Sequence, residues 1–271
     1  MLLEYQRRHP HLIRLILQPT NVGMTRNWRD LLNAPRGRYV AYCEGDDYWT
    51  DEEKLQKQVD FLERHPDYVL CFTRGRVENE LLRTSAIAPA RTGDISIADL
   101  VASNDQLTAT CVYRVLPEVS RLPEWMLEFP FGDLILYLWL LHTTRMRASC
   151  IDDITAVYRV HASGIYGSMT DSPQRNIVRH ERHVQFYLLL RKHLLSGECD
   201  DEIRSALLTR FTILNKLYIE THQYHRALAN IAAVVRHTGR ARPAYWNFEA
   251  LMKHLAQRTL ARDVGRPSNP S

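Results

Sequence analysis

The chain lacks the cysteine patterns of zinc sites and disulfide frameworks. Its cysteines, Cys43, Cys71, Cys111, Cys150 and Cys199, are odd in number, widely spaced and without a CxxC pair. No basic stretch followed by an apolar one marks its start, and the longest apolar run, residues 134–141, is far shorter than the ~18 residues that a membrane helix needs. A Gly-rich phosphate loop is also missing, which argues against P-loop phosphoryl or nucleotidyl transfer. These absences predict a cytosolic globular protein with reduced thiols.

A concentrated charge of one sign is missing as well. The 35 Lys and Arg residues are scattered and outnumber the 31 Asp and Glu residues only slightly, which gives a formal charge of +4. A nucleic-acid partner would require a basic stripe, so we expect none. A weak preference for anionic substrates or for a membrane surface stays open. With 271 residues, 45% of them hydrophobic, the chain can form one large domain or a domain with an appendage.

Helix and strand patterns alternate over the first part of the chain. They predict a helix before Pro10, a strand at 12–17, a helix from Thr25 to Leu32, a strand at 39–43, a helix at 54–65 and a strand at 68–73. This alternation predicts an α/β fold with a mostly parallel mixed sheet flanked by helices. Later strands are expected at 108–115 and 148–158, whereas residues 74–93 carry no clear pattern. Residues 134–141 fit a buried helix or a buried strand, and we favour the helix.

Beyond residue 170 the pattern is helical almost throughout. Apolar spacing predicts four helices between Asn176 and Leu260, without a fixed repeat. We therefore expect a core at 1–170, an all-α region at 171–262 and a disordered tail at 263–271.

Three carboxylates follow the expected strand at 39–43 within four residues: Glu44, Asp46 and Asp47. Open α/β sheets place their ligands at the carboxyl ends of strands. Carboxylates this close together repel one another unless positive charge lies among them. A hard divalent cation, Mg²⁺ or Mn²⁺, carrying phosphate oxygens would satisfy both conditions. A solvated acidic turn is an equal alternative.

Two short motifs near this turn fit a ligand site. Asn21-Val22-Gly23 with Arg26 combines a backbone that permits close approach with polar and cationic groups, although an ordinary strand-to-helix turn would look the same. Trp49 fits the wall of a sugar or nucleotide pocket and equally a position in the core.

Two later motifs also combine suitable groups. Asp133 opens the apolar segment at 134–141, and from the residues alone we favour an N-cap over a general base with a raised pKa. Arg159 and His161 follow an expected strand and suit contacts to a phosphate and to a metal or acceptor. A surface loop is the alternative for this pair.

In this order the motifs resemble the family 2 glycosyltransferases of the GT-A fold. The matching pieces, which run to about residue 168, are Asn21-x-Gly23-x-x-x-Asn27, Ala34-x-x-Gly37-x-Tyr39-Val40-Ala41, Glu44-Gly45-Asp46-Asp47-Tyr48-Trp49, Lys54-Leu55-Gln56-Lys57-Gln58, Ser103-Asn104, Gly132-Asp133 and Tyr158-Arg159-Val160-His161. The resemblance implies a Rossmann-like GT-A core followed by helices that match nothing in the family.

The resemblance implies roles for these residues. Glu44 and Asp46 correspond to the D-x-D-like pair that holds a divalent metal, Mg²⁺ or Mn²⁺, on the donor's diphosphate, and Asp133 to the base that deprotonates the acceptor hydroxyl. The predicted donor-binding residues are Asn21, Gly23, Arg26, Asp47, Trp49 and Arg159, and the predicted metal ligands are Glu44, Asp46 and His161.

The implied activity is metal-dependent transfer of a sugar from a nucleotide-diphosphate donor to an acceptor hydroxyl, with inversion. A UDP-sugar is the family default for the donor, and a glycan or lipid-linked molecule is the implied acceptor. The implied setting is surface polysaccharide or glycan assembly in the cytoplasm, with peripheral attachment to the inner face of the membrane left open.

One part of the family pattern has no counterpart. Family members begin with a strand, a helix and a strand that ends in an Asp-rich turn, whereas residues 1–5 resemble the helix after that region. We therefore expect a core that is incomplete at its N-terminus and binds sugar nucleotides weakly or not at all. The alternative to an enzyme is an inactive fragment, or a non-catalytic scaffold or binding protein, that retains a relic of the fold.

Overall fold

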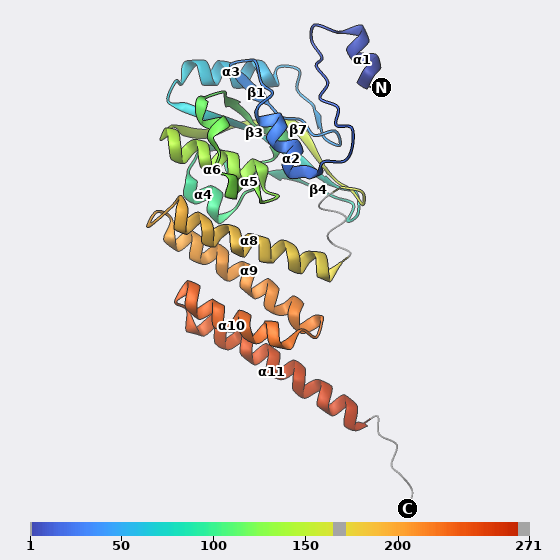
Figure 1. Ribbon diagram of the computed structural model, residues 1–271, viewed down its shortest axis with the longest axis vertical. Coiled ribbons are helices and arrows are strands. Elements are labelled where there is room, and N and C mark those ends of the chain that lie inside the picture. Colours follow the sequence, from blue (N-terminus) through green and yellow to red (C-terminus); the bar gives the residue numbers. More distant parts are fainter. Residues whose placement is uncertain (1, 165–171, 265–271) are drawn as a thin grey trace, which may run out of the picture.

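The computed structural model describes residues 2–164 and 172–264. The strands are β1 (Tyr39–Ala41), β2 (Tyr48–Trp49), β3 (Tyr68–Asn79), β4 (Thr84–Ala88), β5 (Gly93–Ile95), β6 (Val112–Arg114) and β7 (Arg147–Val160). The helices are α1 (Leu2–Arg8), α2 (Gly23–Leu32), α3 (Lys54–Arg64), α4 (Ile97–Ala102), α5 (Glu124–Leu127), α6 (Gly132–Thr144), α8 (Pro173–His193), α9 (Asp200–Glu220), α10 (Tyr224–Thr238) and α11 (Ala241–Val264), with 3-10 turns η1 (Thr108–Thr110) and η2 (Pro117–Arg121). The pair α8–α9 lies between the sheet and the pair α10–α11 (Figure 1).

The described strands form one mixed sheet of seven strands in the order β1-β6-β3-β7-β2, with β4 paired to β3 and β5 to β7. β3 and β7 run parallel, from Tyr68 beside Arg147 to Asn79 beside Val160. All other pairings among the described strands are antiparallel. The α/β fold with a mixed sheet is confirmed, and its form is consistent with a GT-A-like fold.

The expectation that most strands run parallel is wrong. Parallel pairing needs a long crossover connection, and the chain supplies one between β3 and β7, where α4, α5 and α6 intervene. In contrast, β4 folds back on β3 as a hairpin, within residues 74–93 where the sequence shows no clear pattern. Alternating helix and strand patterns do not distinguish these two kinds of connection.

The predicted strand at 12–17 is absent. This segment follows α1 without regular structure, and its apolar side chains face solvent, with Leu12 84% and Leu17 63% exposed. A strand is stable only when its backbone groups find partners in a sheet. The apolar pattern alone therefore gave a wrong assignment here.

α6 lies at the centre of the core. Its residues Leu134–Leu138 are all buried, and the ring of Tyr137 meets Phe72 of β3 edge to face at 4.9 Å between centroids. The helix that we favoured for residues 134–141 is confirmed. A helix that is apolar all round must be covered on every side, and α6 is enclosed by the sheet, α4, α5 and η2.

The C-terminal helices continue this core. Phe186 and Leu190 of α8 and Leu207 of α9 belong to the same cluster of buried side chains as Phe72 and Leu136. α10 and α11 cover the far side of α9 and share a second, smaller cluster with α8 and α9. Most of the predicted disordered tail, 265–271, lies outside the described residues, and residues 263 and 264 end α11.

Candidate active site

The acidic turn connects β1 to β2 and lies beside the end of β7. The backbone N–H of Asp47 donates to the carbonyl of Glu44 at 3.1 Å, which closes the turn. β2 then pairs antiparallel with β7, with Tyr48 opposite Val157. Because the two strands run in opposite directions, the residues before Tyr48 meet the residues after Val157.

Two contacts follow from this pairing. Oδ2 of Asp46 lies 3.1 Å from Nε2 of His161, whose Nδ1 lies 2.9 Å from Oγ of Ser163. Oδ1 of Asp47 accepts a hydrogen bond from the backbone N–H of Arg159 at 3.0 Å. The fold thus brings together four predicted site residues that are more than a hundred positions apart in the chain.

The Arg159 guanidinium is committed elsewhere. Its Nη2 donates to Oε1 of Glu80 at 2.7 Å, and its Nη1 lies 3.4 Å from the carbonyl oxygen of Asp46. Glu80 was not singled out in the sequence, because a lone acidic residue beyond a strand carries no motif. Its carboxylate offsets much of the positive charge that Arg159 would present to a phosphate.

The carboxylates of the turn carry more negative charge than their surroundings balance. Burial, together with the charges of Asp47 and Asp133, raises the pKa of Glu44 to about 8. Burial also raises the pKa of Asp47, and Oδ2 of Asp47 is buried without a donor. Without a cation, Glu44 and Asp47 therefore hold one proton between them near neutral pH.

Asp133 approaches the turn from the first turn of α6. Its Oδ1 accepts the N–H of Leu134 at 2.7 Å, and its Oδ2 receives Asn104 at 3.3 Å and Thr108 at 3.5 Å. Burial raises its pKa, although these hydrogen bonds oppose the shift. Thr108 was missed in the sequence, where it read only as part of a strand.

The N-cap interpretation of Asp133 is wrong. The N-cap position belongs to Phe131, whose side chain makes no capping bond. The helix begins at Gly132, so Asp133 is its second residue. An N-cap residue precedes the helix and bonds the second or third N–H beyond itself. At its observed position the carboxylate is stabilised by the helix dipole while one oxygen faces polar side chains.

Gly132, next to Asp133, lies against α2. A Cβ atom on Gly132 would come within 2.6 Å of the indole ring of Trp28. That ring also packs against Tyr42, 5.0 Å away between centroids, just before the acidic turn. Trp28 therefore supports the start of α6 and the end of β1 at the same time.

The remaining predicted donor residues are less closely connected. Oδ1 of Asn21 accepts the N–H of Gly23 at 2.9 Å, and Gly23 has a φ of 78°, so this segment is a local turn into α2. Arg26 is exposed on α2. No hydrogen bond or ion pair between described residues joins these three to the acidic turn. Trp49 is half-buried, and its Nε1 donates to the carbonyl of Ala109 at 3.0 Å.

The turn offers oxygen donors but no preformed metal cluster. Within residues 2–164 and 172–264, no three His, Cys, Asp or Glu side chains converge in a metal-binding arrangement. The buried, donorless Oδ2 of Asp47 and the proton held by Glu44 nevertheless fit a missing positive charge. Carboxylate oxygens are the ligands that Mg²⁺ and Mn²⁺ prefer.

Fold and site together define an α/β protein with a GT-A-like mixed sheet and an acidic turn beside a carboxylate on α6. Residues 1–103 match the family described as glycosyl transferase family 2. The resemblance is thus confirmed for this part of the chain and supports a glycosyltransferase in general. The matched segment includes the acidic turn, whereas Asp133, Arg159 and His161 lie beyond it.

The similar curated proteins carry no assigned function. The chain is 40% identical over 167 residues to uncharacterized proteins of Mycobacterium tuberculosis (strain H37Rv, Rv1520) and Mycobacterium bovis (Mb1547). The alignment covers 61% of this chain and 47% of each relative. The chain thus spans about half the length of the curated relatives that it matches. No helix within the described residues has the length and apolar character to cross a membrane.

Proposed function

We propose that this protein transfers a sugar from a nucleotide-diphosphate donor to an acceptor hydroxyl, with inversion at the anomeric carbon. The observation that carries the proposal is the placement of the Asp133 carboxylate, held by Asn104 and Thr108 at the start of α6, where its charge adds to those that raise the pKa of Glu44 in the acidic turn. A base and an anionic turn side by side fit a reaction that removes a proton at one end and releases a diphosphate at the other.

Asp133 is the proposed general base. In-line attack requires the acceptor oxygen to lose its proton as it bonds to the anomeric carbon, on the side opposite the departing diphosphate. Asn104 and Thr108 hold one oxygen of Asp133, and burial raises its pKa toward the range in which it can accept that proton. The N-terminus of α6 favours the ionised form of Asp133, which is the form that a base needs, and so opposes part of this rise.

A divalent cation, Mg²⁺ or Mn²⁺, is the proposed cofactor of the turn. When bound, it would neutralise charge on the leaving diphosphate. Glu44, Asp46 and Asp47 would supply oxygen ligands, with Glu44 giving up its proton. His161 contacts Asp46 directly, so it either joins the ligand set or orients Asp46 for it.

The partners follow from the same chemistry. His161 borders the turn and would face the diphosphate of the proposed donor, a UDP-sugar. Arg159 would add the part of its charge that Glu80 does not offset. A glycan or lipid-linked acceptor and a role in surface polysaccharide or glycan assembly at the inner face of the membrane complete the proposal. Asn21, Gly23, Arg26 and Trp49 remain predicted donor contacts.

The test uses the full chain with Mn²⁺ and a panel of UDP-sugars, and measures UDP release and Mn²⁺ affinity. Asp133→Asn should lower turnover by roughly 10²–10⁴-fold, the usual worth of a general base, and leave Mn²⁺ affinity unchanged. Asp67→Asn, at a surface carboxylate paired with Arg147, is the matched control and should keep full activity. If Asp133→Asn turns over at the wild-type rate, the assignment of the base fails. If the wild type binds neither Mn²⁺ nor UDP-sugars, the proposed function fails.

A further inference from the structure

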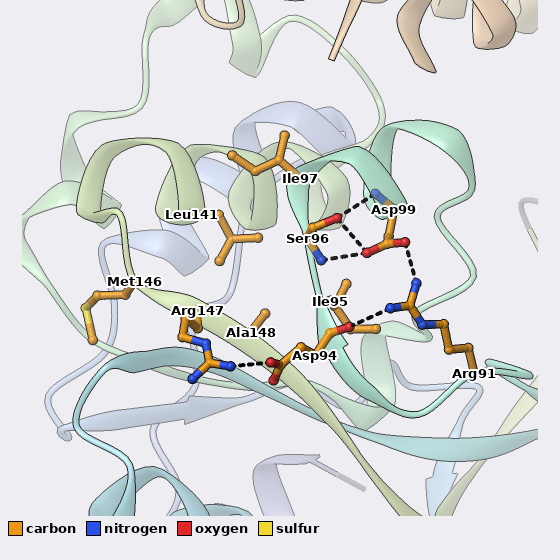
Figure 2. A pocket seen from close by; sticks show the side chains of 10 residues that line it. All are labelled: Arg91, Asp94, Ile95, Ser96, Ile97, Asp99, Leu141, Met146, Arg147 and Ala148. Atoms are coloured by element: carbon orange, nitrogen blue, oxygen red, sulfur yellow. Dashed lines mark hydrogen bonds and ion pairs between the residues drawn. The ribbon is translucent and has the colours of Figure 1, made fainter. Parts of the chain in front are cut away.

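Two cavities lie away from the acidic turn and differ in how their charges are balanced. The first, of about 490 Å³, lies where β5, β7 and α4 meet. Figure 2 shows that its arginines face carboxylates of the same cavity: Arg91 pairs with Asp99 at 2.7 Å, and Arg147 with Asp94. Asp99 also closes the capping box of α4 with Ser96. The charges of this cavity are satisfied internally.

The second cavity, of about 540 Å³, lies where α8 and α10 end and α9 begins. The residues lining it are Arg191, Ser196, Gly197, Asp200, Arg204, Arg236, His237, Thr238 and Gly239. Three arginines thus face one carboxylate. The volume is in the range of small-molecule sites.

The single carboxylate does not balance the arginines. Asp200 pairs with Arg204 at 3.3 Å, and Arg204 also approaches Asp201 at 3.7 Å. Arg191 and Arg236 form no ion pair with any described carboxylate. Arg191 instead donates to the carbonyl of His237 at 3.2 Å, which fixes its guanidinium at the cavity wall. The excess positive charge therefore lies on Arg191 and Arg236.

The pKa of His237 is sensitive to the charge of these two arginines. Its pKa is lowered by burial and by the charges of Arg191 and Arg236. Its ring stacks on Phe211 at 6.2 Å between centroids, so it is held between the core of α9 and the two arginines. An anion bound between the arginines would reverse the electrostatic part of this shift.

We propose that this cavity binds a phosphate or diphosphate group. Two guanidiniums without carboxylate partners provide paired N–H donors in the geometry that suits phosphate oxygens. Ser196 and the loop at Gly197 add polar groups to the same wall, whereas the hydroxyl of Thr238 already donates to the carbonyl of Val234 at 2.6 Å. The site is separate from the proposed transfer site and would stand if that proposal failed. A soluble phosphate ester and a phospholipid headgroup share this chemistry.

The competing explanation is local. Arg191 and Arg236 lie in the last turns of α8 and α10, where cations stabilise helix C-termini by about 0.3–1 kcal/mol. That role predicts an effect of substitution on stability and none on anion binding.

The experiment follows the His237 ring by NMR in the full chain labelled at histidine, assigned with His237→Gln. One titration adds inorganic pyrophosphate, and a second adds vesicles of phosphatidylcholine with phosphatidic acid. Binding of pyrophosphate, or of the phosphatidic acid headgroup, should raise the pKa of His237 by at least about 0.5 in the corresponding titration. Arg191→Gln and Arg236→Gln should abolish the response, and Arg121→Gln, at an exposed arginine of η2, should keep it.

The two arms distinguish the sources, since pyrophosphate alone indicates a soluble ester and vesicles alone indicate a headgroup. The proposal is overturned if neither addition shifts His237, or if the shift survives in both cavity variants. Thermal unfolding of each variant shows whether it is folded. Since His237 is observed directly, a loss of transferase activity alone would not affect this result.

Discussion

Replacing Gly132 with alanine should destabilise the protein, although this substitution usually stabilises a helix. Alanine is favoured over glycine within helices by ~0.5–1 kcal/mol. At Gly132, however, the new Cβ would lie 2.6, 2.7 and 2.9 Å from three atoms of the Trp28 ring. Carbon atoms in contact normally lie about 3.5–4.0 Å apart, so the ring must retreat by about 1 Å.

Trp28 has little room to retreat. Tyr42 packs against it at 5.0 Å between centroids, and the hydroxyl of Tyr42 lies 3.1 Å from that of Tyr113. Overpacking of this kind costs about 1–3 kcal/mol. Subtracting the helix preference leaves a net loss of about 0–2.5 kcal/mol. Its midpoint, about 1 kcal/mol, corresponds to roughly 2–4 °C in Tm. Because Asp133 is the next residue, turnover should fall as well.

Thermal unfolding followed by circular dichroism measures this loss. Gly45→Ala is the matched control, because a Cβ there meets nothing within 4 Å. Trp28→Leu combined with Gly132→Ala should recover part of the loss, since the two sites interact directly. A rise in the Tm of Gly132→Ala would refute the packing argument, because it would mean that the ring yields without cost.

Three further predictions concern the acidic turn and its support. Mn²⁺ affinity should rise with pH up to about 8 and then level off, because Glu44, whose pKa is about 8, must release its proton; calorimetry that shows no pH dependence would contradict this. Arg159→Ala should change Mn²⁺ affinity by less than about twofold, because Asp47 is held by the backbone N–H of Arg159; a large loss in the same titration would assign that role to the side chain. Burial lowers the pKa of Lys54 from 10.5 to about 8, so the folded protein binds fewer protons than the unfolded chain between these values and its stability rises across them. Lys54→Met should have a flatter unfolding profile from pH 8 to 10.5, and equal slopes would argue against a buried, neutralised amine.

The strongest sequence predictions were those in which one pattern had one physical outcome. Residues 134–141 are apolar on every side, and they form the buried helix α6. The acidic residues after Ala41 lie together because they occupy one short turn between β1 and β2. Their neighbours from β7 could be anticipated only through the resemblance, because no local pattern specifies that Tyr48 pairs with Val157.

The failures involve partners that are distant in the chain. Residues 12–17 have the composition of a strand, but strand formation depends on a neighbour that composition does not reveal. Glu80 neutralises Arg159 although nothing near either residue predicts the pair. Likewise, aspartate is a residue type common at N-caps, and only the backbone shows that the helix already begins at Gly132, before Asp133.

The Lys54–Gln58 motif supports the acidic turn from behind. Nε2 of Gln58 donates to the carbonyls of Cys71 and Thr110, both at 2.8 Å, which joins α3 to β3 and η1. Nζ of Lys54 donates to Oε1 of Gln58 at 2.7 Å and lies 4.7 Å above the ring of Trp49 in β2. Removing either partner would leave a buried polar atom unsatisfied, at a cost of about 1–3 kcal/mol.

This arrangement gives Trp49 a positioning role. Trp49 is fixed by Lys54 on its face and by the carbonyl of Ala109 at its edge, and it directly follows Tyr48, where β2 begins to pair with β7. A shift of Trp49 would move the acidic turn relative to His161 and Arg159. Trp49→Phe keeps an aromatic side chain but replaces the indole with a smaller ring and loses the Nε1 donor, so it should lower Mn²⁺ affinity together with stability. If Trp49 itself contacts the donor, Trp49→Phe should instead lower sugar-nucleotide affinity and leave Mn²⁺ affinity unchanged.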